Sequence, residues 1–486
     1  MTPARVLHFI DGGPAEAASG ASFEDRDPAT GELLAHVARG DAADVDRAVD
    51  AGHRALAGAW GATSVDERAA LLERTAALLE ARADEAALLE SEDSGKPLAL
   101  ARRLDIPRAI ANLRFFAQAV RQAGAPCHPM ADALNYTVRK PLGVVALITP
   151  WNLPLYLLTW KAAPALAMGN AVVAKPSELT PRTASLLAEL LTEAGAPSGA
   201  FNVVHGFGAE AGEPLCAHAG VRGVSFTGGT ATGARVAQVA APGFKKLSLE
   251  LGGKNATLVF ADADLEAAAD GAVRAAFTNQ GQICLCGSRV LVEASIHDRF
   301  LDAMVARVAR LRTGDPRDPA SDLGALISHA HRDKVEGYLR LAREEGGTVR
   351  VGGGRPALQP PLDGGAFLEP TLVSGLAPGC RTATEEIFGP VATVHPFTDE
   401  AEALAMANGV RYGLSASLWT RDLARAHRAA ARLDVGMVWV NTWLHRDLRV
   451  PFGGVKQSGV GREGGGWSLE FFSEAVNVCV HLGERS

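Results

Sequence analysis

The sequence predicts an α/β protein built around a parallel sheet, and three observations lead to that fold class. Between residues 143 and 253, short apolar runs alternate with helical segments at similar intervals. Such alternation indicates right-handed crossovers and a parallel sheet with helices on both faces. A second alternating series follows in the C-terminal half. The chain has 486 residues, 47% hydrophobic and 21% charged, which suffices for two or three domains with filled cores.

The first hundred residues are expected to form polar loops followed by helices. Asp41 has the residue type of a helix N-cap, and an apolar face begins at Val45. Ser64 and Glu67 have the spacing of a capping box, in which each side chain bonds the backbone N–H of the other residue. That box predicts the start of a long Ala/Leu helix.

Five apolar runs are predicted strands of the first sheet, and each ends in polar or glycine residues. A helix between two of them is expected at residues 182–195. Because ligands bind at the carboxyl ends of parallel strands, these ends should form one lip of a site. The runs and their ends are "GVVALITP" with Pro150, Trp151 and Asn152; "NAVVAKPS" with Lys175 to Glu178; "FNVVHGFG" with Gly206 to Gly208; "GVSFTGG" with Thr227 to Gly229; and "KKLSLELGG" with Glu250 to Gly253.

The C-terminal half predicts a second α/β series without a flexible linker, so the domains should be interleaved. Helices are expected from about residue 264 to 277 and over roughly 296–346, before a Gly/Pro-rich loop at 352–366. The predicted strands are "ATLVF" (256–260), "RVLVE" (289–293), a buried "GMVWVNTW" (436–443) and an edge strand "EAVNVCVHL" (474–482).

Charge and cysteine usage narrow the range of partners. The net charge is −7 and no basic block stands out, so nucleic acid is not expected as a partner. The six cysteines are scattered, which predicts reduced thiols in a cytoplasmic protein rather than a disulfide framework. The opening "MTPARVLHFIDGG" lacks the apolar run of a signal peptide, and no 18-residue apolar window predicts a membrane span.

The stretch "NQGQICLCGSR" (279–289) places Cys284 and Cys286 one residue apart. Zinc usually takes four ligands from two Cys/His pairs, and no second pair follows, so no metal is expected. A disulfide across C-x-C would close a strained small ring. Two interpretations stay open: a pair of buried apolar cysteines, or one nucleophile with a neighbour. A nucleophile needs a base and an oxyanion donor, because a thiol is weakly ionised at neutral pH.

Candidates for both partners lie at the predicted strand ends. Glu250, backed by glycines, could project into a cleft as a general base, or it could pair with Lys254 at the surface. Asn152, flanked by prolines, could stabilise an oxyanion with its amide, or it could be an Asx-turn residue.

A cofactor site has weaker local signals. "FTGGTATG" (226–233) predicts a strand, a turn and a helix whose N–H groups could bind phosphate, although it is not a G-x-G-x-x-G fingerprint. Lys175 and Glu178 end another strand, and a carboxylate there suits a ribose diol and repels a 2′-phosphate. Each signal alone is more typical of a protein surface than of a cofactor site.

Taken together, these stretches resemble the NAD(P)-dependent aldehyde dehydrogenase superfamily over essentially the whole chain. The resemblance implies a Rossmann-like NAD domain (1–122 and 142–251), an α/β catalytic domain (252–452) and a small β oligomerisation element (123–141 and 468–486). It also implies at least a homodimer, or a homotetramer. The matching motifs, in order, are "ITPWNLPL", "VVAKPSELTP", "NVVHGFG", "FTGGTATG", "LELGGKN", "FTNQGQICLCGSR", "EEIFGPV" and "PFGGVKQSGVGRE".

The resemblance also implies residue roles. Cys284 matches the family nucleophile, Glu250 the general base and Asn152, with the backbone N–H of Cys284, the oxyanion hole. The implied reaction runs through a hemithioacetal and a thioester that Glu250 helps water to hydrolyse. The cofactor is expected to be NAD, and the residues expected to bind it are Ile148, Trp151, Lys175, Ser177, Glu178, Gly208, Phe226, Thr227, Gly228, Gly229, Gly233, Leu251, Glu386 and Phe388.

The substrate end resembles one branch of the family, the 2-aminomuconate and 2-hydroxymuconate 6-semialdehyde dehydrogenases. Ile283 before the nucleophile and the stretches "DIPRAIANLRFFAQ", "ALNYTVRKPLGVV", "ISHAHRDKVEGYLRLA" and "VNTWLHRDLRVPFGG" carry that likeness. We expect substrate contacts from Arg108, Arg446, Arg449 and Phe452, with Arg108 and Arg446 clamping a distal carboxylate.

Three alternatives remain open from the sequence. Arg108 could instead lie on a solvated helix face while Arg446 pairs with Asp447. The substrate could be an aliphatic aldehyde or a shorter semialdehyde. The protein could also be a non-catalytic NAD-binding protein on the same fold. The sequence does not choose between the amino and the hydroxy substrate.

Overall fold

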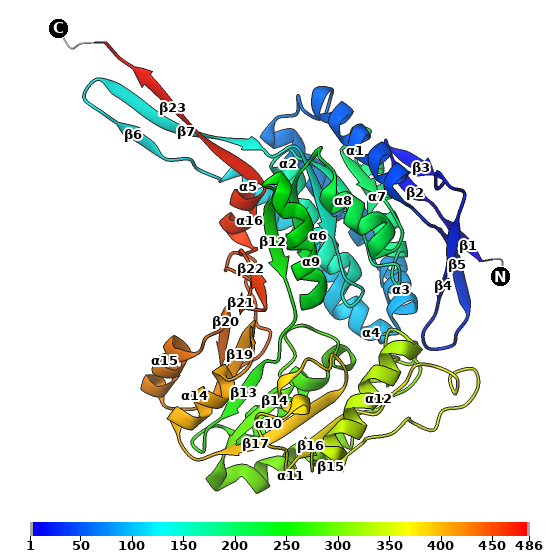
Figure 1. Ribbon diagram of the computed structural model, residues 1–486, viewed down its shortest axis with the longest axis vertical. Helices are drawn as coiled ribbons and strands as arrows, with labels where there is room; N and C mark the ends of the chain where they lie inside the picture. The colour runs from blue at the N-terminus through cyan, green and yellow to red at the C-terminus, as the bar shows by residue number, and fades with distance from the viewer. Residues whose placement is uncertain (1–2, 484–486) are drawn as a thin grey trace.

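The computed structural model describes residues 3–483, which form two large sheets with a protruding arm (Figure 1). Residues 1, 2 and 484–486 of the predicted domains lie outside the described residues. Within residues 3–483, no helix combines the length and the apolarity that crossing a bilayer requires. The predicted α/β class is confirmed.

The first sheet has a parallel centre, as expected from the five apolar runs. Every residue of its two middle strands, β8 and β9, is buried, which requires cover on both faces. Helices α1 (Ala42–Ala57) and α6 (Pro154–Ala167) pack on these two strands, and α7 (Arg182–Glu193) and α9 (Thr230–Ala240) pack on the neighbouring strands of the sheet. The strand order is β22 (Gly459–Val460), β12 (Lys246–Glu250), β11 (Val221–Thr227), β8 (Val144–Ile148), β9 (Ala171–Lys175), β10 (Phe201–Val203), β2 (His8–Ile10) and β3 (Gly13–Ala15).

The strand register brings the predicted site residues to one edge of this sheet. Ile148 pairs with Lys175 across β8 and β9, and Thr227 pairs with Glu250 across β11 and β12. Since these strands are parallel, their carboxyl ends lie side by side and face the second sheet (Figure 1).

The second sheet carries the C-terminal half. Its order is β15 (Thr348–Val351), β16 (Thr371–Ser374), β17 (Val391–Phe397), β14 (Arg289–Glu293), β13 (Ala256–Val259), β19 (Ser415–Trp419) and β20 (Met437–Val440). Helix α10 (Leu265–Phe277) packs near it and leads directly into the stretch that contains the two cysteines. The predicted helix and strands around residues 256–293 are confirmed.

One expectation about the C-terminal half was wrong. The strand "GMVWVNTW" is not buried, because β20 is the last strand of its sheet and Val440 is 39% exposed. The helices expected over roughly 296–346 are α11 (His297–Val308) and α12 (His329–Glu344), and Gly314, Pro316 and Pro319 lie in the stretch that separates them.

The N-terminal loops also contain strands that the polar pattern hid. They are β1 (Ala4–Val6), β4 (Ser22–Arg26) and β5 (Leu33–Ala38), beside β2 and β3. Strand β4 is mostly solvent-exposed, so its charged residues gave no apolar alternation. The expected helices do follow, and both capping signals are present, at Asp41 before α1 and as a Ser64–Glu67 box before α2 (Val65–Ala81).

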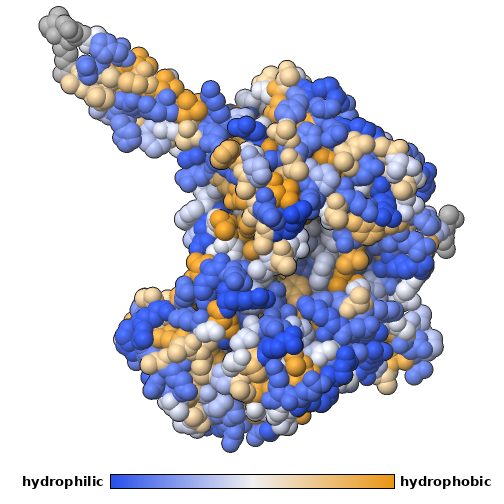
Figure 2. Space-filling view, in the orientation of Figure 1, coloured by the Kyte–Doolittle hydropathy of each residue, from blue (hydrophilic) through white to orange (hydrophobic). Residues whose placement is uncertain are grey.

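The arm is a small antiparallel sheet of β6 (Cys127–Pro129), β7 (Ala133–Pro141) and β23 (Ser473–His481). Strand β23 lies at its edge, as predicted, and pairs along its whole length with β7. The arm projects away from the rest of the chain, and apolar side chains gather along it (Figure 2). The exposed large apolar residues there are Met130, Tyr136, Val480 and Leu482.

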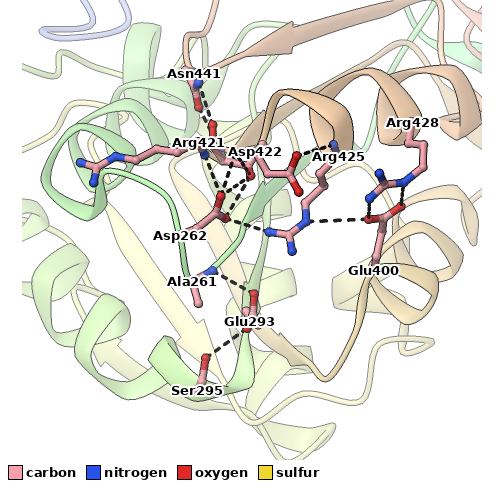
Figure 3. Close-up of polar contacts among 11 residues, drawn as sticks. Ala261, Asp262, Glu293, Ser295, Glu400, Arg421, Asp422, Arg425, Arg428 and Asn441 are labelled. Atoms are coloured by element: carbon pink, nitrogen blue, oxygen red, sulfur yellow. Dashed lines mark hydrogen bonds and ion pairs between the residues drawn. The ribbon is translucent and has the colours of Figure 1, made fainter.

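A charged network stabilises the second sheet at the carboxyl end of β13 (Figure 3). Asp262, just after β13, accepts hydrogen bonds from the backbone N–H groups of Arg421 and Asp422 at 2.9 Å each. Arg425 on α15 (Leu423–Arg432) donates to Asp262 at 2.8 Å. The guanidinium of Arg425 also lies 3.8 Å from the carboxylate of Glu400 on α14 (Glu400–Asn408). These partly exposed pairs fix two surface helices to the sheet.

A glycine in α10 sets the distance between this helix and the sheet beneath it. A Cβ at Gly271 would collide with the ring of Trp419, which is only 5% exposed. We therefore expect Gly271→Ala to cost about 1–3 kcal/mol of stability through overpacking. Thermal unfolding at matched concentration measures it as a lower melting midpoint.

The matched control is Gly337→Ala in α12. The nearest atom to a Cβ there is Arg340 Nη2 at 3.7 Å, so this variant should gain up to about 1 kcal/mol. A Gly271→Ala protein that melts at or above the wild-type midpoint would contradict the packing argument.

Candidate active site

Cys284 lies in the loop between α10 and β14, partly exposed, at the junction of the two sheets. Burial, together with the nearby carboxylates of Glu250 and Glu386, raises the pKa of its thiol to about 12, while Arg446 acts in the opposite direction. The resting thiol is therefore protonated, and its ionisation requires a base or a cation at the site.

The backbone of this loop is fixed from several sides. Asn255 donates its amide to the carbonyl oxygens of Cys284 (2.7 Å) and Cys286 (3.0 Å). Gly281 has φ +70°, and a Cβ there would collide with the carbonyl of Gly389. Only glycine fits both constraints, so the loop has one backbone path to the cysteine.

Asn152, at the end of β8, is interlocked with the cysteine loop. Its side-chain amide donates to the carbonyl of Gln282 at 2.9 Å, and its own carbonyl accepts from the amide of Asn279 at 3.1 Å. Asn152 and Cys284 line the same cavity. The second N–H of the Asn152 amide makes no hydrogen bond to the described residues, which leaves a donor for a ligand.

Glu250 ends β12, as predicted, but it does not pair with Lys254. Both of its carboxylate oxygens are buried without a hydrogen-bond partner among residues 3–483. Burial first, and the nearby Glu463 second, raise its pKa well above the ordinary value. Lys254 instead donates to the carbonyl of Thr382 at 2.9 Å. A buried carboxyl with free oxygens and a raised pKa has the character of a general base.

One cavity, of about 280 Å³, opens beside Cys284. Glu386 reaches it from the loop before β17 and accepts from the backbone N–H of Gly253 at 2.8 Å. Phe388 follows at φ +62°. The expected residues that line this cavity are Trp151, Asn152, Thr227, Gly228, Gly229, Leu251, Cys284, Glu386 and Phe388.

Two lining residues of this cavity were missed by the sequence reasoning, His331 and Lys334 on α12. His331 Nε2 lies 2.7 Å from the carbonyl oxygen of Phe388, and its ring meets Trp151 edge-on at 5.3 Å. Both belong to "ISHAHRDKVEGYLRLA", a stretch that in the sequence indicated only a likeness to the muconic semialdehyde branch of the family. Their helical spacing of three residues was the one signal that could have placed them on a common face.

A second cavity, of about 440 Å³, continues along the strand ends and contains Ile148, Gly208 and Phe226. Lys175 lies 3.4 Å from Glu178, and burial lowers its pKa. Ser177 is buried next to them. Gly233 lines neither cavity, and a Cβ there would collide with Leu251, so its role is to let α9 pack closely.

The expected substrate arginines occupy an aromatic setting. Arg446 lies 4.0 Å from the centre of the Phe452 ring and donates to the Tyr156 hydroxyl at 2.9 Å. Arg108 lies over the Tyr156 and Trp160 rings at 5.5 and 5.9 Å. Nε and Nη2 of both guanidinium groups are buried without a partner in the described chain. These are four free donors within one groove.

Arg449 lies apart from this pair. Its side chain is 78% exposed and forms a two-bond ion pair with Asp447. The alternative in which Asp447 pairs with Arg446 is therefore not what the structure has. The structure brings together two of the three expected arginines and leaves the third at the rim of the groove.

Cys286 is buried, with its sulfur 3.9 Å from the carbonyl oxygen of Thr278. Burial raises the pKa of its thiol to about 12. It lines neither of the two cavities.

Comparison with known proteins gives one consistent result. A family model described as the aldehyde dehydrogenase family matches residues 15–478. A 2-aminomuconic 6-semialdehyde dehydrogenase from Pseudomonas sp. is 50% identical, over 99% of this chain and 98% of that protein. A 2-hydroxymuconic semialdehyde dehydrogenase from Pseudomonas sp. (strain CF600) is 49% identical, over 98% of this chain and 99% of that protein.

Among solved structures, the NAD+ complex of an aldehyde dehydrogenase from Bacillus cereus has a TM-score of 0.96. It is 38% identical and covers 99% of this chain and 97% of that one. Sequence and fold agree along nearly the full length, and the chain belongs to the aldehyde dehydrogenase family.

Proposed function

We propose that the protein is an NAD-dependent dehydrogenase that oxidises 2-aminomuconate or 2-hydroxymuconate 6-semialdehyde to the dicarboxylic acid. The observation that carries the choice of substrate is the pair Arg108 and Arg446, whose buried Nε and Nη2 groups have no partner in the described chain. A carboxylate at the far end of a short conjugated aldehyde satisfies such donors through bidentate bonds. The names of two relatives, which are 50% and 49% identical to this chain, agree with this choice.

The two cavities along the strand ends fit a dinucleotide. A Cβ at Gly208 or Gly229 would meet no atom within 4 Å, so both glycines border open space. Lys175 and Glu178 would hold the adenosine ribose, and Glu386 the nicotinamide ribose. The carboxylate of Glu178 favours NAD over NADP. When bound, NAD+ supplies the hydride acceptor for the aldehyde carbon.

In this mechanism the Cys284 thiol gives its proton to a water molecule and attacks the aldehyde as the thiolate, and the oxyanion accepts bonds from the free Asn152 amide N–H and the Cys284 backbone N–H. Loss of hydride leaves a thioester on Cys284. Glu250 then takes a proton from water, and the resulting attack releases the acid and the thiol.

The arm is proposed to form the contact between subunits, and the two large sheets are proposed to be the centres of two domains. We propose that β23 and the apolar surface of the arm contact a second copy, giving a homodimer or homotetramer. The proposed division into residues 1–122 with 142–251, 252–452, and 123–141 with 468–486 is supported by the sheets, because the strands of the first sheet except β22 fall in the first part, those of the second sheet in the second part, and those of the arm in the third. Six unpaired cysteines favour the reducing cytoplasm, which cell fractionation would test.

Replacement of Glu250 by glutamine separates the two chemical steps. Acylation of Cys284 does not need this carboxylate, but hydrolysis does, so a first-turnover burst of NADH should remain while steady turnover falls about 10²–10⁴-fold. Rapid mixing followed by NADH absorbance measures both phases. Cys284→Ser is the control and should show neither phase. Loss of the burst in Glu250→Gln would contradict the assigned role.

The raised pKa of Glu250 gives the wild-type enzyme a pH signature. Only the ionised carboxylate accepts a proton from water, so thioester hydrolysis should rise with pH through that raised pKa, well above the ordinary carboxyl range. Single-turnover hydrolysis of preformed thioester across the pH range measures this limb. A hydrolysis rate that rises with pH only through the ordinary carboxyl range, or that does not rise with pH at all, argues against Glu250 as the base.

The arginine pair gives the test of substrate class. Arg108→Ala and Arg446→Ala should each lower kcat/KM for a muconic semialdehyde by about 2–4 kcal/mol, mostly through KM. Neither variant should lower kcat/KM for an uncharged aliphatic aldehyde to that extent. Arg449→Ala is the matched control, because its guanidinium already pairs with Asp447. Unchanged KM in both variants would reject the carboxylate clamp.

The oligomer is tested on the arm. Val478→Pro removes a ladder hydrogen bond from β23 and should disrupt its edge, so sedimentation should shift from a multiple of the chain mass toward the monomer. A wild-type protein that sediments as a monomer would reject the assembly proposal.

A further inference from the structure

Three charged side chains lie buried behind Asn152, outside the cavities and the arginine groove. Lys96 has a side chain that is 1% exposed, and the carboxylates of Glu90 and Asp105 are fully buried. They come from α3 (Ala83–Ser94), from the turn after it, and from the π-helical turn Ala101–Asp105. None of the three lines either cavity beside the strand ends.

The cluster contacts the backbone on both sides of the turn that follows Asn152. Lys96 Nζ donates to Asp105 at 2.9 Å and to the carbonyl oxygen of Asn152 at 3.0 Å, and it lies 3.5 Å from Glu90. The other oxygen of Glu90 accepts from the backbone N–H of Leu155 at 3.3 Å. One ammonium and one carboxylate thus hold both ends of the segment that presents the Asn152 amide.

The turn that carries Lys96 is also tied to the cysteine loop. The carbonyl of Gly95 accepts from the N–H of Ala325 at 2.8 Å. Two side chains of the cysteine loop form hydrogen bonds with the same stretch of backbone, residues 325–327. Gln280 donates to the carbonyl of Ala325 (3.1 Å), and Gln282 accepts from the N–H of Ile327 (3.1 Å). A shift of Lys96 would therefore disturb the spacing between the Asn152 amide and Cys284.

Stability alone does not account for this cluster. Burying ions is costly, and apolar residues of similar volume often stabilise a core as well or better. Burial raises the pKa of Glu90 to about 7 and also raises that of Asp105, so both carboxyls resist ionisation despite the neighbouring ammonium. π-turns such as the one that ends at Asp105 are also concentrated at functional sites.

We propose that Lys96, held by Glu90 and Asp105, is a positioning residue that fixes the Asn152 peptide and so aims the Asn152 amide at the oxyanion on Cys284. The inference rests on the proposed oxyanion role of Asn152. Lys96 touches no substrate atom, and its effect passes entirely through the Asn152 segment. Misplacement of a catalytic group by about 1 Å costs on the order of 10²-fold in rate.

The test is a double-mutant cycle on activity with 2-hydroxymuconate semialdehyde and NAD+. Lys96→Met should lower kcat about 10- to 100-fold while the Kd for NAD+ changes less than about 3-fold. In an Asn152→Ala background, which keeps the backbone carbonyl but lacks the amide, Lys96→Met should cause no further loss of kcat. A structural role would lower kcat in both backgrounds.

Arg182→Met is the matched control. Arg182 also lies in a buried charged cluster against α3, with Asp93 and Glu92, but it has no bond to Asn152. It should lower the melting midpoint and leave kcat within about 2-fold. If Lys96→Met does not fold, Asp105→Asn loosens the same ammonium and enters the same cycle, with an expected loss of about 5-fold or more.

The outcomes separate the two proposals. If Asn152→Ala alone keeps wild-type kcat, the oxyanion role and the inference built on it both fail. If Asn152→Ala is impaired and Lys96→Met folds with unchanged kcat, only the positioning role fails. It also fails if the two losses multiply in the double variant.

Discussion

The reciprocal hydrogen bonds between Asn152 and the cysteine loop are the constraint on which the site depends. Asn152 lies four residues after the end of β8 in the first sheet, and the loop leads from α10 into the second sheet. Each donates an amide to a carbonyl of the other. The relative position of the two sheets therefore sets the distance between the Asn152 amide and the Cys284 thiol. Neither residue can shift without the other.

Around that interlock, the protein keeps several buried polar groups without partners. Glu250 has two free oxygens, and Arg108 and Arg446 have four free donor atoms among the described residues. Such groups cost stability when they have no ligand. At the surface the same residue types are paired, as in the network of Asp262, Arg425 and Glu400 (Figure 3). Partners are thus missing where a substrate with a carboxylate and a reacting carbonyl would supply them.

The sequence predicted the five central strands of the first sheet, β8 to β12, because they read as continuous apolar runs. It missed β4 because a solvated strand such as SFEDR has no apolar alternation, and it misjudged β20 because apolar residues alone do not say which strand ends a sheet. The pair Asn152 and Cys284 was predictable from motifs. His331 and Lys334 were not, because only the fold brings α12 to the cavity, and the same holds for Lys96 behind Asn152. Arg449 had the right residue type and lies near the groove, but the local ion pair with Asp447 occupies its guanidinium.

The central claim is that Cys284 alone carries the acyl group, although Cys286 lies two residues away. Tandem mass spectrometry of the Glu250→Gln protein, quenched after reaction with NAD+ and a muconic semialdehyde, locates the thioester directly. The account predicts one acyl group per chain, on Cys284, and an unmodified Cys286. An acyl group on Cys286, or none on either cysteine while NADH is formed, would contradict it.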